Sequence, residues 1–172
     1  MKSFSKTALL GSLAAALLCS TLANASAAGI ERIYGDNPMS PIAAGVSVPP
    51  GYTTFYISGA LPKPVTPAAN GQPADFGDTA AQTRSVLDGL KATMDKMGVG
   101  FGDVVAAHVF LSETADFAAM NKVWAEEFGT AAQPNKPARA AFRTYALVLP
   151  GAALEIEFIA AKKVGPMKKM KK

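Results

Sequence analysis

The sequence has one cysteine, Cys19, and one histidine, His108. A disulfide needs two cysteines, and zinc or iron sites are usually built from several cysteine and histidine side chains. This scarcity argues against a disulfide-dependent fold and against a metal site of the histidine–cysteine type. His108 lies inside an apolar segment, where we expect it to be packed or to lie at an interface rather than to bind a ligand.

A run long enough to cross a membrane is also missing. The main apolar run, residues 8–18, is shorter than the roughly 20 residues that a spanning helix needs. It follows Lys2 and Lys6 and leads to Ala25-Ser26-Ala27, a cleavage site with two small residues around a spacer. These are the three parts of a signal peptide, which we expect over residues 1–27.

Cleavage is expected near Ala28, and cleavage after Ala25 is the alternative. A lipoprotein signal at Cys19 is a further alternative, but the bulky Leu18 stands where that cleavage needs a small residue. We therefore expect a periplasmic or secreted chain that has no cysteine, and thus no thiol nucleophile, and no stable membrane insertion after the leader is removed.

Basic residues are few in the body of the chain. Of the 17 lysines and arginines, two lie in the expected leader and six lie in residues 162–172. Residues 28–161 therefore hold nine basic residues against 13 acidic ones, and they are long enough for one domain with a real core. Nucleic acid is bound mainly through positive charges that neutralise its phosphates, so we expect no nucleic-acid partner for this acidic domain. Residues 162–172 are predicted to be a disordered basic tail, with weak contact with an anionic membrane surface as the alternative.

The chain shows no internal repeat and no glycine-rich phosphate loop. Its apolar residues follow the two-residue period of strands in some segments and the 3.6-residue period of helices in others. Strands are predicted at residues 30–34, 45–48, 52–59 and 104–111, with two more in the closing stretch. Helices are predicted at residues 79–97, capped by Asp78 or Thr79, and at 117–128, capped by Thr114 or Asp116, while 61–78 is a long loop.

This order of elements predicts an α+β fold. Two helices cannot cover both faces of the sheet, so we expect them on one face. The other face is then solvated or buried against another subunit. The apolar run at residues 104–111 favours burial on both faces, through Val104, Val105, Val109 and Phe110. Trp124 and Phe128 are at helical spacing and are predicted to be core residues.

The closing stretch, residues 137–161, carries the most specific pattern. Leu154, Ile156 and Phe158 alternate with Glu155 and Glu157, which is typical of a strand with one face in a core. The Pro150-Gly151 turn before it predicts a closing hairpin with the segment that begins at Arg139. If the two segments pair, the Arg139 guanidinium and a glutamate carboxylate line one small site. A guanidinium binds a carboxylate group through two parallel hydrogen bonds, so such a site suits a ligand that carries a carboxylate.

The same stretch resembles the C-terminal signature of the RidA/YjgF family of enamine/imine deaminases. The resemblance extends from about Ile30 to Ala161 and rests on the order and spacing of short motifs. They are a loose match at Ser40 to Gly45, then Tyr56-Ile57-Ser58-Gly59-Ala60, Ala80 to Arg84, Leu87 to Lys91, Gly102 to Val105, Val109 to Leu111, Phe117 to Trp124, Pro137-Ala138-Arg139 and Leu154 to Ala161.

The resemblance implies a chorismate-mutase-like fold, assembled as a homotrimer with a small-molecule site in each cleft between subunits. It implies hydrolysis of reactive 2-imino acids, or of their enamine tautomers, to 2-oxo acids and ammonia without a cofactor. By this resemblance, Arg139 holds the carboxylate of the substrate and Glu155 positions the attacking water. Both are therefore candidate catalytic residues, with Glu157 as a structural neighbour.

The resemblance also places Ser58, Gly59, Asn121 and Ala141 around the ligand. Three positions depart from the family pattern, because Ile42 stands for a pocket tyrosine, Ala60 for a glutamine and Ala141 for a frequent cysteine. Each change removes a polar group, so we expect a more apolar pocket.

Two other functions stay open at this point. The first is a trimer that binds carboxylate ligands without chemistry, which the apolar replacements favour. The second is a chaperone-like trimer, which export and the basic tail favour. Arg143 is interpreted as a surface residue, with a second anion contact as the alternative.

Overall fold

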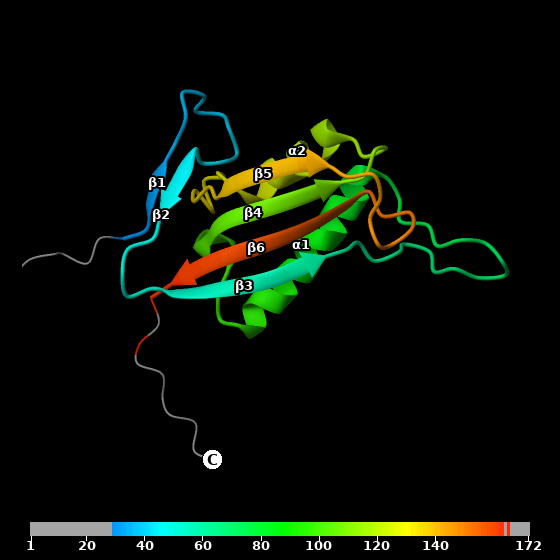
Figure 1. Ribbon diagram of the computed structural model, residues 1–172, viewed down its shortest axis with the longest axis horizontal. Coiled ribbons are helices and arrows are strands. Elements are labelled where there is room, and N and C mark those ends of the chain that lie inside the picture. Colours follow the sequence, from blue (N-terminus) through cyan, green and yellow to red (C-terminus); the bar gives the residue numbers. More distant parts are fainter. Residues whose placement is uncertain (1–28, 164, 166–172) are drawn as a thin grey trace, which may run out of the picture.

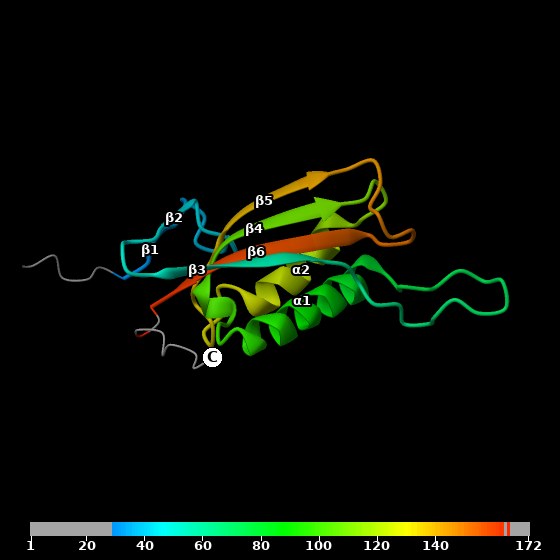
Figure 2. The same ribbon diagram turned by 60° about the horizontal axis from the view of Figure 1, so that its bottom comes forward.

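The computed structural model of the chain describes residues 29–163 and 165. The predicted leader, and residues 164 and 166–172 of the predicted tail, lie outside the described residues. The described chain forms a two-stranded sheet and a four-stranded sheet with two α-helices packed on one of its faces (Figures 1 and 2). The elements are β1 (Glu31–Ile33), β2 (Gly45–Ser47), β3 (Thr53–Ala60), α1 (Thr79–Lys96), the 3-10 helix η1 (Phe101–Asp103), β4 (Val104–Leu111), α2 (Phe117–Glu127), β5 (Ala138–Arg143) and β6 (Leu154–Lys162).

The helices begin at side-chain caps. The Asp78 carboxylate accepts a hydrogen bond from the Ala81 N–H at 2.7 Å, and the Asp116 carboxylate accepts from the N–H groups of Ala118 and Ala119. Of the two caps predicted for each helix, the structure therefore uses the aspartate, whose oxygen satisfies backbone donors that the first helical turn leaves free. Both helices thus start where the sequence indicates.

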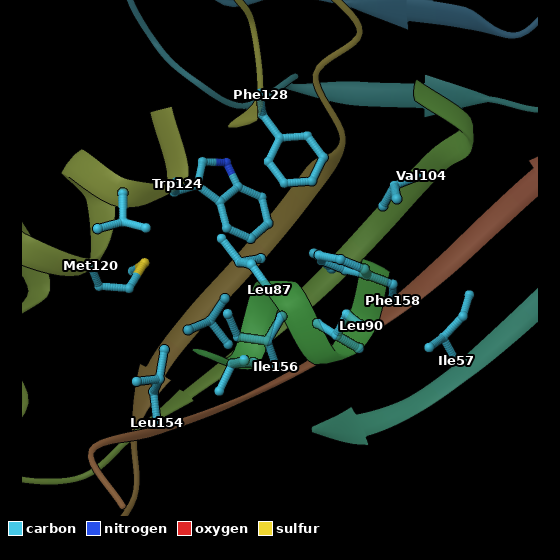
Figure 3. Close-up of a cluster of buried hydrophobic side chains, with 14 of the residues drawn as sticks. Ile57, Leu87, Leu90, Val104, Met120, Trp124, Phe128, Leu154, Ile156 and Phe158 are labelled. Carbon is cyan, nitrogen blue, oxygen red and sulfur yellow. The ribbon is translucent and has the colours of Figure 1, made fainter. Parts of the chain in front are cut away.

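The core between the helices and the sheet is largely aromatic on one side (Figure 3). The Trp124 and Phe128 rings stack with centroids 4.4 Å apart, and Phe158 of β6 meets both of them edge-on. All three side chains are at most 1% exposed. The prediction that Trp124 and Phe128 are core residues is confirmed.

The four-stranded sheet has the order β3-β6-β4-β5, so the predicted closing hairpin is wrong. β4 lies between β5 and β6, parallel to β5 and antiparallel to β6. α2 connects two parallel neighbours, β4 and β5, and this crossover puts β5 at the edge of the sheet. The apolar face of β6 is buried completely, which requires a central position under the helices.

After Val105, burial in β4 alternates, so this chain itself buries only the face of the strand toward the helices. Val104 and Val109 belong to the core under the helices, so they are not evidence that the other face of the sheet is buried. We call the face of the four-stranded sheet away from the helices the open face. It carries Phe110 and Phe142, whose rings meet edge-on, and Tyr56, which is 75% exposed. Because these rings are apolar, the open face is suited to burial against another molecule.

β6 runs further than the predicted domain boundary at residue 161. Lys162 is the last residue of the strand, and its Nζ donates to the Gly98 carbonyl at 2.8 Å and pairs with Asp103. The predicted disordered tail therefore does not begin at residue 162. In the part of the chain that the structure describes, neither helix is long and apolar enough to cross a bilayer.

Candidate functional site

Arg139 lies on the edge strand β5, on the side of the sheet that faces the helices. Its Nη2 donates to the Asn121 Oδ1 of α2 at 2.6 Å, and its Nη1 lies 3.9 Å from the Met120 sulfur. The guanidinium carbon is 4.7 Å from the centre of the Trp124 ring. The arginine and Asn121, both predicted to contact the ligand, are therefore side by side.

The guanidinium has no acidic partner among the described residues, although it is largely removed from water. Desolvation lowers the pKa of Arg139 to about 10, so the group is still a cation at neutral pH. A guanidinium offers five N–H donors, and Asn121 accepts from only one of its nitrogens at a short distance. The remaining donors can grip a carboxylate in a two-bond geometry.

The lowered pKa has a consequence for stability. A cation whose pKa is lower in the folded state than in the unfolded state costs stability below the folded pKa, and the cost disappears as the pH rises through the unfolded pKa. Arg139→Met, measured by thermal unfolding at pH 7, is therefore expected to leave the melting temperature unchanged or to raise it. A fall of more than about 5 °C, near 1 kcal/mol for a small domain, would contradict this and make Arg139 a structural tie between β5 and α2.

Two other predicted residues lie on β5 or in the loop that is tied to its start. The opening loop is tied to the start of β5 by a hydrogen bond from the Ala43 N–H to the Pro137 carbonyl, and to α2 by the bond from the Trp124 Nε1 to the Pro41 carbonyl. Ile42 lies in this loop and packs against the core. Ala141 follows Arg139 on the same side of β5 and lines a hollow of about 300 Å³ together with Leu111, Phe117, Phe142 and Arg143.

Glu155 belongs to a second group, on the open face. It lies opposite Phe110 in the register of β4 and β6. Next to it, β3 bulges, because Ser58 and Gly59 together oppose the single residue Glu157. A side-chain carbon added at Gly59 would lie 2.0 Å from the Glu155 Oε1, so the carboxylate rests directly against the Gly59 backbone.

Arg139 and Glu155 are therefore not brought together within one chain. Arg139 pairs with Ala107 and Glu155 with Phe110, so they are three residues apart along β4 and one strand away on each side of it. At about 3.3 Å per residue and about 4.8 Å per strand, this is roughly 10 Å in each direction, and the side chains lie on opposite faces. The prediction that a hairpin brings Arg139 and a glutamate carboxylate into one site is wrong, because β4 lies between β5 and β6.

One pair of residues on the open face was not predicted. The His108 Nδ1 lies 2.6 Å from the Glu157 Oε1, across the β4–β6 pair. The alternation of each strand shows on which of its faces His108 or Glu157 lies. Only the register between β4 and β6 places the two residues opposite each other. Glu157, which was expected to be structural, thus holds His108, which was expected to be packed or to lie at an interface.

A larger cleft lies elsewhere. It has a volume of about 630 Å³ and lies between the starts of the two helices and the loop at residues 145–153. None of the predicted site residues lines it. Among residues 29–163 and 165, no cluster of histidine, cysteine and acidic side chains is arranged to hold a metal ion.

Comparison with known proteins matches the sequence of this chain to one family. The family described as Endoribonuclease L-PSP matches residues 44–162. The 3-aminoacrylate deaminase RutC of Acinetobacter baylyi is 35% identical over 130 residues, which cover 76% of this chain and 96% of that protein. A RutC family protein of Pyrococcus horikoshii is 35% identical over 132 residues, covering 77% of this chain and 98% of that protein.

Solved structures show the same fold. A Rid family protein from Yersinia pestis superposes with a TM-score of 0.61 at 23% identity, over 78% of this chain and all of that one. A YjgF family member from Neisseria meningitidis gives a TM-score of 0.51 at 24% identity, over 79% and 97% of the two chains. Because the family match spans residues 44–162 and the RutC relatives are 35% identical over nearly their whole length, the chain belongs to the RutC/RidA/YjgF family.

Proposed function

We propose that this protein hydrolyses reactive 2-imino acids, or their enamine tautomers, to 2-oxo acids and ammonia without a cofactor. The observation that carries the proposal is the desolvated Arg139 guanidinium with no acidic partner among the described residues. A desolvated cation of this kind is stabilised by an anionic ligand, and its planar guanidinium fits a carboxylate. The deaminase named among the relatives supports the same chemistry.

We further propose that the site is completed between copies of the chain in a homotrimer. Arg139 belongs to β5, the edge strand of the sheet (Figure 2). Glu155 lies on the open face, so each half of the site is accessible to a neighbouring copy. The apolar rings of Phe110 and Phe142 on the open face favour its burial in such an assembly. One copy would supply Arg139, Asn121, Ile42 and Ala141, and the next would supply Ser58, Gly59 and Glu155.

In this arrangement the substrate carboxylate binds Arg139 and the imine carbon lies near Glu155 of the adjacent copy. Glu155 accepts a hydrogen bond from a water molecule, orients it and takes its proton as the oxygen adds to the C=N carbon. The nitrogen takes up protons, the C–N bond breaks, and the C=O bond of the 2-oxo acid forms as ammonia leaves. Water and imine together balance the 2-oxo acid and ammonia, so no oxidant or reductant is needed.

Binding without chemistry is a second candidate, because Ile42, Ala60 and Ala141 bring no polar side chain to the site. RNA is a weaker candidate ligand, despite the description of the matched family. Residues 28–161 carry more acidic than basic side chains, and the one histidine of the sequence is held by Glu157. We propose a periplasmic or secreted location, as the signal-peptide pattern indicates, with no stable insertion in the membrane after cleavage.

The test uses purified residues 28–172 and an amino-acid oxidase that generates imines in place. The measured quantity is the imine that semicarbazide traps, for the wild type, Arg139→Gln and Glu155→Gln. Deaminase activity predicts faster imine loss with the wild type alone. Binding of 2-oxo acids without faster imine loss would replace the first candidate by the second, and no binding at all would contradict both.

A further inference from the structure

The hollow next to Ala141 has a second arginine, Arg143, in its lining. Arg139 and Arg143 lie on the same face of β5, because they are four residues apart in a strand. Ala141 lies between them and leaves room for a ligand, and Phe117 of α2 lies beside the Arg139 guanidinium, with its ring centre 6.0 Å away. The hollow thus has Arg143 in its lining, and the Arg139 guanidinium lies beside Phe117, which forms part of its wall.

Arg143 is held in place by the backbone. Its Nη1 donates to the carbonyl groups of Ser112 at 3.0 Å and Glu113 at 2.8 Å. Its Nε and Nη2 have no hydrogen-bond partner among the described residues, and no carboxylate there is within ion-pair distance. The guanidinium is therefore oriented at one nitrogen and free to bind an acceptor at the others.

We propose that Arg143 binds a second carboxylate and makes this protein selective for 2-imino dicarboxylates with a short aliphatic chain. The inference rests on the proposed function, since it assigns the side-chain end of the same substrate. Four residues of strand separate the two arginine Cα atoms by about 13 Å. A five-carbon dicarboxylate of about 5 Å with N–H···O bonds of about 2.8 Å at each end spans about 11 Å, which is somewhat less than this Cα separation.

Arg139 and Arg143 differ in burial, and this difference gives them different roles. Arg139 is desolvated and holds the carboxylate next to the imine, which every 2-imino acid carries. Arg143 is exposed, so its pair with the second carboxylate is weaker and sensitive to salt. Arg143 is thus a specificity-determining residue, and the reaction at the imine carbon does not change.

Calorimetric titration with 2-oxoglutarate and 2-oxopentanoate tests the assignment, because these stable acids differ only in the second carboxylate. The wild type is expected to bind 2-oxoglutarate about five- to tenfold more tightly at low salt. Arg143→Gln is expected to remove this preference and leave 2-oxopentanoate binding unchanged, while Arg139→Gln weakens both. Arg84→Gln, on the exposed face of α1, is the control for loss of one positive charge.

The outcomes separate the two levels of the proposal. Equal affinity of the wild type for the two acids, or a preference that survives Arg143→Gln, overturns the second carboxylate site while the Arg139 site stands. No binding of either acid overturns the proposed function together with this inference. Loss of the preference in Arg84→Gln as well would show a general charge effect and would also overturn the assignment.

Discussion

Trimers that mix Arg139→Gln and Glu155→Gln subunits are expected to recover imine hydrolysis that neither variant has alone. Within one chain the two side chains lie on opposite faces of the sheet, with β4 between their strands. Each proposed site therefore takes its arginine from one copy and its glutamate from the next. In a cyclic trimer that contains both variants, one site in three has both residues intact, so about one third of the wild-type rate is expected.

The mixed trimers are obtained by coexpression with two different affinity tags and purification over both. Each pure variant should be at least about 100-fold slower than the wild type, because positioning or proton transfer is lost. Wild type with both tags is the control for the tags and the purification. Mixed trimers as slow as the pure variants would show that one chain supplies both residues, or that the proposed assembly is wrong.

Gly59→Ala is expected to lower the rate of hydrolysis by about 100-fold while the protein stays folded. The new methyl group would lie 2.0 Å from the Glu155 Oε1, and only this flexible side chain would have to move. The backbone at Gly59 has no positive φ, so alanine adds no strain there. The carboxylate would leave the position in which it orients water, and a positioned general base contributes on the order of 100-fold or more.

Gly45→Ala is the matched control, because nothing lies within 4 Å of an added carbon at that position. Both variants should unfold within about 1 kcal/mol of the wild type. Binding of 2-oxo acids through Arg139 should persist in Gly59→Ala, so the loss should appear in the maximal rate. Full activity of Gly59→Ala would show that the position of Glu155 against Gly59 has no part in the reaction.

The elements were readable from the sequence because their signals are local. The caps at Asp78 and Asp116, the apolar stripe of α1 and the alternation of β6 each involve residues within a few positions of one another. Helix starts depend on backbone donors in the first turn, and strand faces depend on a two-residue period. For the same reason Glu155 was placed correctly on the polar side of its strand.

The arrangement of the strands was not readable in this way. The Pro150-Gly151 turn is compatible with a hairpin, and the chain instead crosses to the far side of β4. What decides this is the burial of Leu154, Ile156 and Phe158 under both helices, which needs the central position in the sheet. The pairing of His108 with Glu157 follows from the same register and has no local signal.

The sequence by itself determined which residues have the chemistry of a carboxylate site: an arginine at a strand start, a glutamate on a polar strand face, and no thiol in the predicted mature chain. Only the tertiary structure decided that Arg139 is desolvated against Trp124 and Asn121 and that Glu155 is on the other face. Residue chemistry is local, whereas desolvation and the side of a sheet depend on strands that are distant in sequence. That difference makes a single chain an incomplete site in the function that we propose.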